Sequence, residues 1–160
     1  MPVTALHRVL LIGYGNPGRG DDGLGPALAA AIEDLGLPGV TVDIDYQLTV
    51  DHAALIAGHD GVIFADAMIG LEKPFRFSPV GTAPPQSLGS HQVTPEAALT
   101  LAGLLFGKAP PGWILAIGGT EFGELHEGLS PQARANLAEA AAFLRGWMVK
   151  TTTAAAPVTP

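Results

Sequence analysis

Residues 13–26 constrain the fold of this chain most strongly, because they join a buried strand to a helix through a glycine-rich turn. The apolar run at residues 9–12 is typical of a strand that is buried on both faces. Apolar side chains recur at helical spacing only from Leu24 onward. The turn in between delivers two adjacent carboxylates, Asp21 and Asp22, to the end of the strand.

Strands and helices are expected to alternate along the rest of the chain. The expected strands cover residues 40–44, 62–66 and 113–117, with an exposed strand or ribbon at 75–77, and the expected helices cover 24–35, 51–57, 94–105 and 130–148. This order predicts a single three-layer α/β domain, residues 1–150, with a mainly parallel twisted sheet and helices on both faces. Residues 151–160 have nothing to bury and are expected to form a frayed tail.

Charge and composition exclude several classes of partner. The 160 residues carry a formal net charge of -7 and no cluster of Lys or Arg, so neither nucleic acid nor an anionic membrane is an expected partner. The chain has no cysteine, which excludes disulfides, thiolate metal sites and a cysteine nucleophile. No apolar run approaches the ~18 residues of a membrane span, and the first eight residues contain no secretory apolar region. We therefore expect a cytoplasmic protein.

Three positions converge on the carboxyl edge of the expected sheet, where ligands bind in such folds. The pair Asp21 and Asp22 follows the first strand, Asp66 closes the third, and His91 lies in the loop before the helix that begins near Thr94. Two carboxylates and an imidazole suit a borderline divalent metal such as nickel or zinc. Each position also has a structural alternative: an aspartate before a helix serves as an N-cap, an aspartate after a strand forms turns, and a loop histidine is often only solvated.

The other histidines are weaker candidates. His7 lies in the N-terminal leader, and His52 and His59 lie on or beside a short helix with no carboxylate placed by a strand. His126 could make a secondary metal contact, although a solvated acidic loop explains it more simply.

Two other kinds of enzyme fit less well. Residues 13–18 match the dinucleotide pattern G-x-G-x-x-G, but the helix starts too late to face a pyrophosphate and two carboxylates would repel it. Ser90 adjoins His91, yet sequence neighbours rarely face each other as nucleophile and base, and no G-x-S-x-G elbow is present.

The chain resembles the hydrogenase maturation proteases. The resemblance covers roughly residues 8–148 and rests on segments in the family's order: GYGNP at 13–17, DDGLGP at 21–26, FADA at 64–67, SHQ at 90–92 and GLSP at 128–131. It implies an endopeptidase, a hydrolase that removes a C-terminal extension from the large-subunit precursor of a nickel–iron hydrogenase after nickel insertion. The implied catalytic and metal-contacting residues are Asp22, Asp66 and His91, with nickel carried by the precursor. Asp21 is then left as a structural cap.

Two alternatives remain at this point. The turn at residues 13–18 also resembles that of peptidyl-tRNA hydrolase, but Asp21 and Asp22 stand where that family has its histidine, and the chain is acidic. The second alternative is a non-catalytic chaperone module that recognises the nickel-loaded precursor, because the sequence shows no self-sufficient catalytic machinery.

Overall fold

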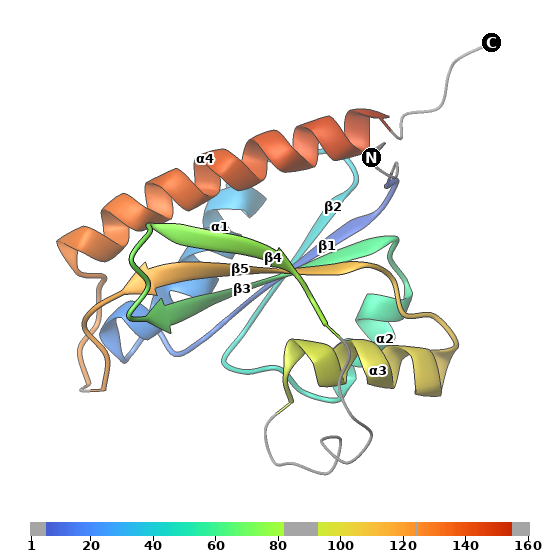
Figure 1. Cartoon of the computed structure of the whole chain (residues 1–160), viewed down its shortest axis with the longest axis horizontal. Coiled ribbons are helices and arrows are strands. Elements are labelled where there is room, and N and C mark those ends of the chain that lie inside the picture. The colour runs from blue at the N-terminus through green and yellow to red at the C-terminus, as the bar shows by residue number, and fades with distance from the viewer. Residues whose placement is uncertain (1–5, 82–92, 124, 155–160) are drawn as a thin grey trace.

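A five-stranded sheet lies between two layers of helices in the computed structural model, which describes residues 6–81, 93–123 and 125–154 (Figure 1). The strands are β1 (Val9–Tyr14), β2 (Val40–Asp45), β3 (Gly61–Ile69), β4 (Phe75–Pro79) and β5 (Gly112–Gly119). The helices are α1 (Leu24–Asp34), α2 (Asp51–Ala57), α3 (Pro95–Phe106) and α4 (Pro131–Ala154), and a short 3-10 helix, η1 (Gly20–Gly23), precedes α1.

The sheet has the strand order β2-β1-β3-β5-β4. Strands β2, β1, β3 and β5 pair in parallel, and β4 pairs antiparallel with β5 at one edge. The register aligns Val9 of β1 with Val40 on one side and with Gly61 on the other. The predicted fold class, a three-layer α/β domain with a mainly parallel sheet, is confirmed.

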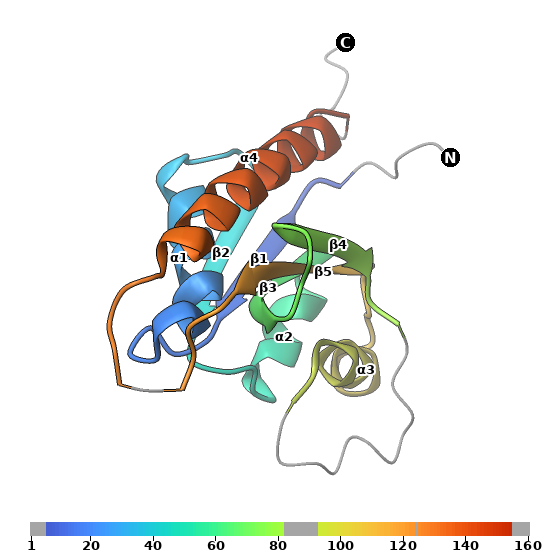
Figure 2. The same cartoon turned by 60° about the vertical axis from the view of Figure 1, so that its left-hand side comes forward.

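Alternate residues of β1 enter two separate cores, which explains its continuous apolar run. Val9 and Leu11 pack into the core beneath α1 and α4, whereas Leu10 and Ile12 pack into the core against α2 and α3. Figure 2 shows α4 and α1 on one side of the sheet and α2 and α3 on the other. Both faces are therefore covered, as a mainly parallel sheet requires.

Strand β1 and helix α1 approach so closely that only glycine fits between them. A Cβ atom on Gly25 would lie 2.4 Å from the carbonyl oxygen of Tyr14 and 2.5 Å from that of Ala65. A Cβ atom on Gly13 would lie 2.3 Å from the carbonyl oxygen of Gly25. The glycines of this junction thus serve strand–helix packing, a role that requires no bound phosphate.

Two elements run further than the sequence predicts. Strand β3 continues to Ile69, because β5 offers a paired partner for every residue up to that point, so Asp66 lies within a strand and does not close it. Helix α4 continues to Ala154, four residues into the predicted tail. Thr151 is buried, and its hydroxyl donates to the carbonyl of Trp147. The last turn of the helix therefore does bury a side chain. Residues 155–160 lie outside the described residues.

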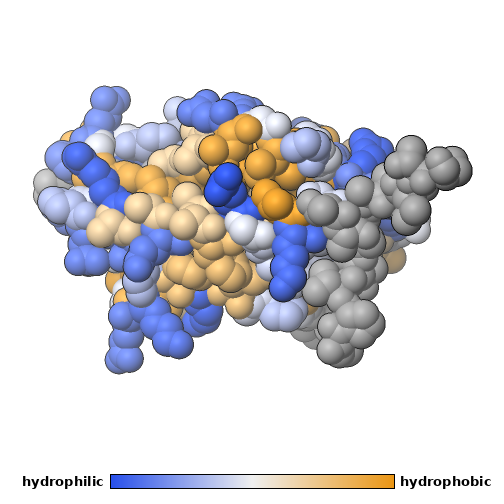
Figure 3. Space-filling view, turned by 90° about the horizontal axis from the view of Figure 1, so that it is seen from above, coloured by the Kyte–Doolittle hydropathy of each residue, from blue (hydrophilic) through white to orange (hydrophobic). Residues whose placement is uncertain are grey.

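The outer surface on the α4 side is mixed in polarity. Figure 3 shows this face with apolar surface lying between hydrophilic patches. Within the described residues, no helix combines the length and the apolar character needed to cross a membrane.

Candidate functional site

A pocket opens at the carboxyl end of β1 and beside Asp66 of β3, where the chain changes direction in the sheet. After β1 the chain passes to β2 on one side, and it then returns to β3 on the other side of β1. Ligands of open α/β sheets bind at such switch points. The pocket has a volume of about 200 Å³. Its lining consists of Tyr14, Gly15, Asp22, Tyr46, Gln47, Leu48, Asp66 and Val93.

Asp22 reaches this pocket from η1, the turn between β1 and α1. Its side chain is half-buried, and its Oδ2 accepts the backbone N–H of Asn16 at 2.7 Å. That bond fixes the orientation of the carboxylate, while Oδ1 accepts no hydrogen bond from any residue that the structure describes. One oxygen is therefore held by the backbone and one can face a ligand.

Asp66 enters the same pocket from β3, so the structure brings two of the predicted site residues together. Its Oδ1 accepts the backbone N–H of Ala67 at 2.8 Å. Burial raises the pKa of Asp66 to about 6, and the negative charge of Asp22 adds to the rise. The Ala67 N–H and the Tyr14 hydroxyl oppose it by hydrogen bonding to the carboxylate. Two carboxylates that repel each other in a half-buried pocket favour a cation between them.

Tyr14 is a member of the site that the sequence analysis did not single out. Burial raises the pKa of its hydroxyl far above the ordinary value, and the charge of Asp66 raises it further. The hydroxyl thus stays protonated at neutral pH and acts as a donor to Asp66. Its position at the end of β1, directly after the buried run, was a usable signal for placing it at this edge.

Asp21 is structural, as the sequence analysis concludes, but it does not cap its own helix. It is fully buried, and its Oδ1 accepts the backbone N–H of Ser130 at 2.7 Å. Its Oδ2 accepts the backbone N–H groups of Thr120 and Glu121 at 2.8 and 2.9 Å and the hydroxyl of Ser130 at 2.7 Å. Burial works to raise its pKa, but these hydrogen bonds prevail and lower it. Asp21 therefore anchors the loop after β5 and the start of α4 to η1.

The third predicted site residue, His91, lies outside the described residues. Val93, two positions later in the sequence, lines the pocket that holds Asp22 and Asp66. The assignment of His91 stays a prediction.

A different group of ligand-type side chains comes together at the end of β2. Within the described part of the chain, Asp43, Asp45 and His52 form the one group of three whose ligand atoms all lie within 4.8 Å of one another. The His52 Nε2 atom lies 3.0 Å from Asp43 Oδ2 and 3.6 Å from Asp45 Oδ2. The expectation that no strand places a carboxylate beside His52 is therefore wrong. Alternation along β2 sends Asp43 and Asp45 to the same face, on which His52 of α2 reaches them.

Hydrogen bonding gives this histidine a structural role. The backbone N–H of Thr49 donates to His52 Nδ1 at 2.9 Å, so the ring proton of the neutral side chain is on Nε2 and is donated to Asp43. A metal ion would need the Nε2 lone pair that this proton occupies. His52 instead ties the end of β2 to the start of α2 and holds the intervening loop, whose residues 46–48 line the pocket.

The remaining described histidines do not reach the pocket. His7 is exposed, and His59 is buried with its Nδ1 donating to the carbonyl of Leu55 at 2.8 Å. The side chain of His126 is exposed, and its backbone pairs with Gly18 and Gly20.

Comparison with solved structures gives a consistent picture of the fold. No protein-family model matches the chain, and no curated protein matches it in sequence. The hydrogenase maturation protease HycI from Thermococcus kodakarensis superposes with a TM-score of 0.70 at 20% identity, over 88% of this chain and 92% of that one. The hydrogenase maturating endopeptidase HybD from Escherichia coli gives 0.66 at 19% identity, over 89% and 93%. The hydrogenase 2 maturation peptidase from a Thaumarchaeota archaeon gives 0.64 at 21% identity, over 88% and 97%.

The chain has the fold of the hydrogenase maturation proteases. The superposed region includes most of the described helices and strands.

Proposed function

We propose that this chain is an endopeptidase that removes the C-terminal extension from the large-subunit precursor of a nickel–iron hydrogenase after nickel insertion. The observation that carries the proposal is the placement of Asp22 and Asp66 in one pocket at the switch point of a maturation-protease fold. The sequence resemblance at residues 13–26 supports the same family. We further propose that the protein works in the cytoplasm with the precursor as its partner, and that neither nucleic acid nor membrane takes part.

In this proposal Asp22, Asp66 and His91 contact the nickel that the precursor brings, so the metal serves as a recognition element. Each of the two carboxylates has one oxygen held by a backbone N–H. Their orientation is therefore set before the substrate arrives. Tyr14, which also lines the pocket, positions Asp66 by hydrogen bonding to it.

A cation beside these carboxylates favours their charged forms, so they act as ligands rather than as bases near neutral pH. A bound metal ion of this kind can polarise a scissile carbonyl or a water. The chain's own contribution is to hold the two carboxylates at the metal, and to orient the precursor so that its peptide bond lies beside it.

Mass spectrometry of a precursor tests the proposal directly. The precursor is incubated with this protein in its nickel-loaded and nickel-free forms. Loss of a C-terminal fragment from the nickel-loaded form alone supports the peptidase with nickel as the recognition element. Binding without any change of mass identifies a chaperone module instead.

Variants assign the residues. Asp22→Ala or His91→Ala is expected to abolish processing while circular dichroism shows an intact fold. Undiminished cleavage by either variant removes that residue from the proposed set.

A further inference from the structure

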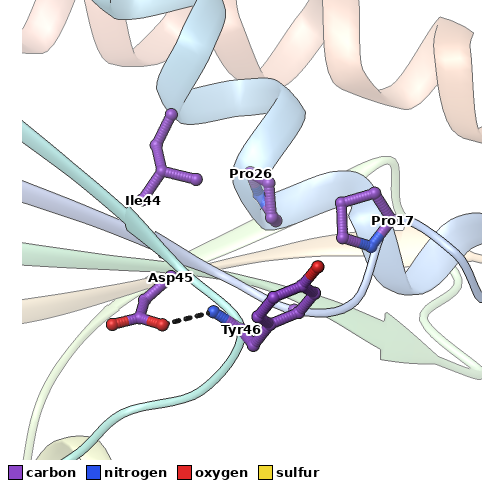
Figure 4. Close-up of a pocket in the computed structure, with 6 residues that line it drawn as sticks. Pro17, Pro26, Ile44, Asp45 and Tyr46 are labelled. Atoms are coloured by element: carbon purple, nitrogen blue, oxygen red, sulfur yellow. Dashed lines mark hydrogen bonds between the residues drawn. The ribbon is translucent and has the colours of Figure 1, made fainter.

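An apolar groove lies beside the pocket that holds Asp22 and Asp66, and the proposed roles of those residues leave it without a function. It consists of two adjoining hollows with volumes of about 310 and 370 Å³, which share Pro17, Pro26 and Ile44. These volumes fall at the lower end of the ~300–1,000 Å³ range of ligand pockets. Figure 4 shows Ile44, Pro26, Pro17 and the ring of Tyr46 arranged around the first hollow.

Three separate elements build the groove. Pro17 comes from the turn after β1, Pro26 from the first turn of α1, and Ile44 from the end of β2. The second hollow continues along α1 to Ala30 and Leu129, and three glycines in its lining leave the floor free of side chains.

Apolar side chains remain exposed along this groove. Ile44 is 44% exposed and Tyr46 is 69% exposed. Isolated apolar residues on a surface need no explanation, but a hollow lined by several of them marks an interaction site. Asp45 is the single charged residue among those described that line the groove. Its carboxylate lies toward His52, on the opposite face of β2 from Ile44. The groove itself is therefore lined by uncharged side chains and suits an apolar occupant.

The groove is continuous with the candidate catalytic pocket. Gly15 and Tyr46 line both the first hollow and the pocket of Asp22 and Asp66. The first hollow therefore adjoins the pocket of the two carboxylates.

We propose that this groove binds an extended segment of the protein substrate next to the bond that is cut, by accepting apolar side chains of that segment. The inference rests on the proposed peptidase function and adds to it the surface that selects the substrate. Apolar side chains of the segment fill the hollows at Pro17, Pro26 and Ile44.

Two groove variants and one control test the inference. Ile44→Gln replaces an apolar wall by a polar side chain, and Ala30→Gln obstructs the second hollow with a residue that suits a helix. The control is Leu35→Gln, because Leu35 is 46% exposed, close to the value of Ile44, and lies at the opposite end of α1 from the groove. Thermal unfolding of all three variants verifies that they are folded.

Cleavage and binding are measured with the nickel-loaded large-subunit precursor from the same organism. Both groove variants are expected to lower kcat/KM by about 10-fold or more, mainly through KM, since one apolar contact in a pocket is worth about 10–200-fold. The control is expected to match the wild type. A precursor in which the residues flanking its cleavage position are replaced by aspartate should lose a similar factor with the wild-type protein.

The outcomes separate this inference from the proposed function. Groove variants that bind and cleave like the wild type overturn the groove and leave the peptidase in place. A wild-type protein that binds the precursor without cleaving it overturns the peptidase, and weaker binding by the groove variants then still supports the groove. A wild-type protein that neither binds nor cleaves the precursor overturns both.

Discussion

Exchange of each of the two adjacent aspartates for asparagine should separate stability from activity. Asp21 is fully buried and accepts three backbone N–H groups and two hydroxyls, the hydroxyl of Thr120 at 3.5 Å being the more distant. Asp22 is half-buried and accepts a single N–H. Asparagine has nearly the same shape as aspartate but only one acceptor oxygen and no charge. The two neighbours therefore provide a matched pair of substitutions in one turn.

The expected cost of Asp21→Asn follows from its contacts. We take the single oxygen of the asparagine to occupy the position of Oδ2, so that its NH2 group occupies the position of Oδ1. The hydrogen bond from the Ser130 N–H to Oδ1 is then lost, and this buried donor faces another donor. A hydrogen bond to a charged group contributes about 1.5–3 kcal/mol, and the remaining bonds to the Oδ2 position weaken because the acceptor is now neutral. We expect a loss of about 3–5 kcal/mol in the free energy of unfolding. For a chain of this length that corresponds to a fall in Tm of about 6–20 °C.

The pH dependence of the effect has a definite sign. The hydrogen bonds lower the folded-state pKa of Asp21, so its contribution to stability is fully present above the unfolded pKa of about 3.9. It is lost as the pH falls through the folded value. The difference in Tm between wild type and Asp21→Asn should therefore be constant near neutral pH and narrow below about pH 4.

Thermal unfolding followed by circular dichroism, together with the precursor cleavage assay, measures both properties. Asp22→Asn should lose about 1 kcal/mol or less, because it gives up at most one hydrogen bond of a half-buried group, while its cleavage activity disappears. A Tm for Asp21→Asn within about 2 °C of the wild type, or a larger loss for Asp22→Asn, would refute this division of roles.

Three further predictions concern the pocket and its supports. In an NMR titration of the side-chain carboxyls, Asp66 should have its midpoint near pH 6. Asp22→Asn should lower that midpoint by removing a like charge, and an unchanged midpoint would contradict the electrostatic interaction between the two aspartates. His52→Leu should free the loop at residues 46–50, seen as faster amide hydrogen exchange there and a roughly tenfold loss of cleavage; exchange as slow as in the wild type counts against its positioning role. Gly25→Ala should destabilise the protein to urea by about 1–3 kcal/mol although alanine is the better helix former, and a gain in stability would show that the backbone there can relax.

Helix caps and hydrophobic periodicity predicted the bounds of those elements whose ends are set by nearby residues. The predicted helix at residues 51–57 has the observed bounds, and the caps expected at Thr94 and Ser130 are present as hydrogen bonds to residues three positions later. The late start of α1 at Leu24 also followed from periodicity alone. The ends of elements that depend on a neighbouring strand were harder to predict from the sequence. Strand β3 extends beyond its apolar run because β5 lies beside it.

The sequence by itself determined the fold class and the arrival of carboxylates at the carboxyl edge of the sheet, since strand ends and helix starts are encoded within a few residues. The tertiary structure decided which aspartate does what. Asp21 and Ser130 are 109 positions apart. Only the folded structure shows that the Asp21 carboxylate accepts hydrogen bonds at the start of α4, while its neighbour Asp22 faces the pocket. Asp43 meets His52 in the same way, across a loop whose path no local pattern specifies. Such contacts depend on how whole elements pack, and packing is a property of the entire chain.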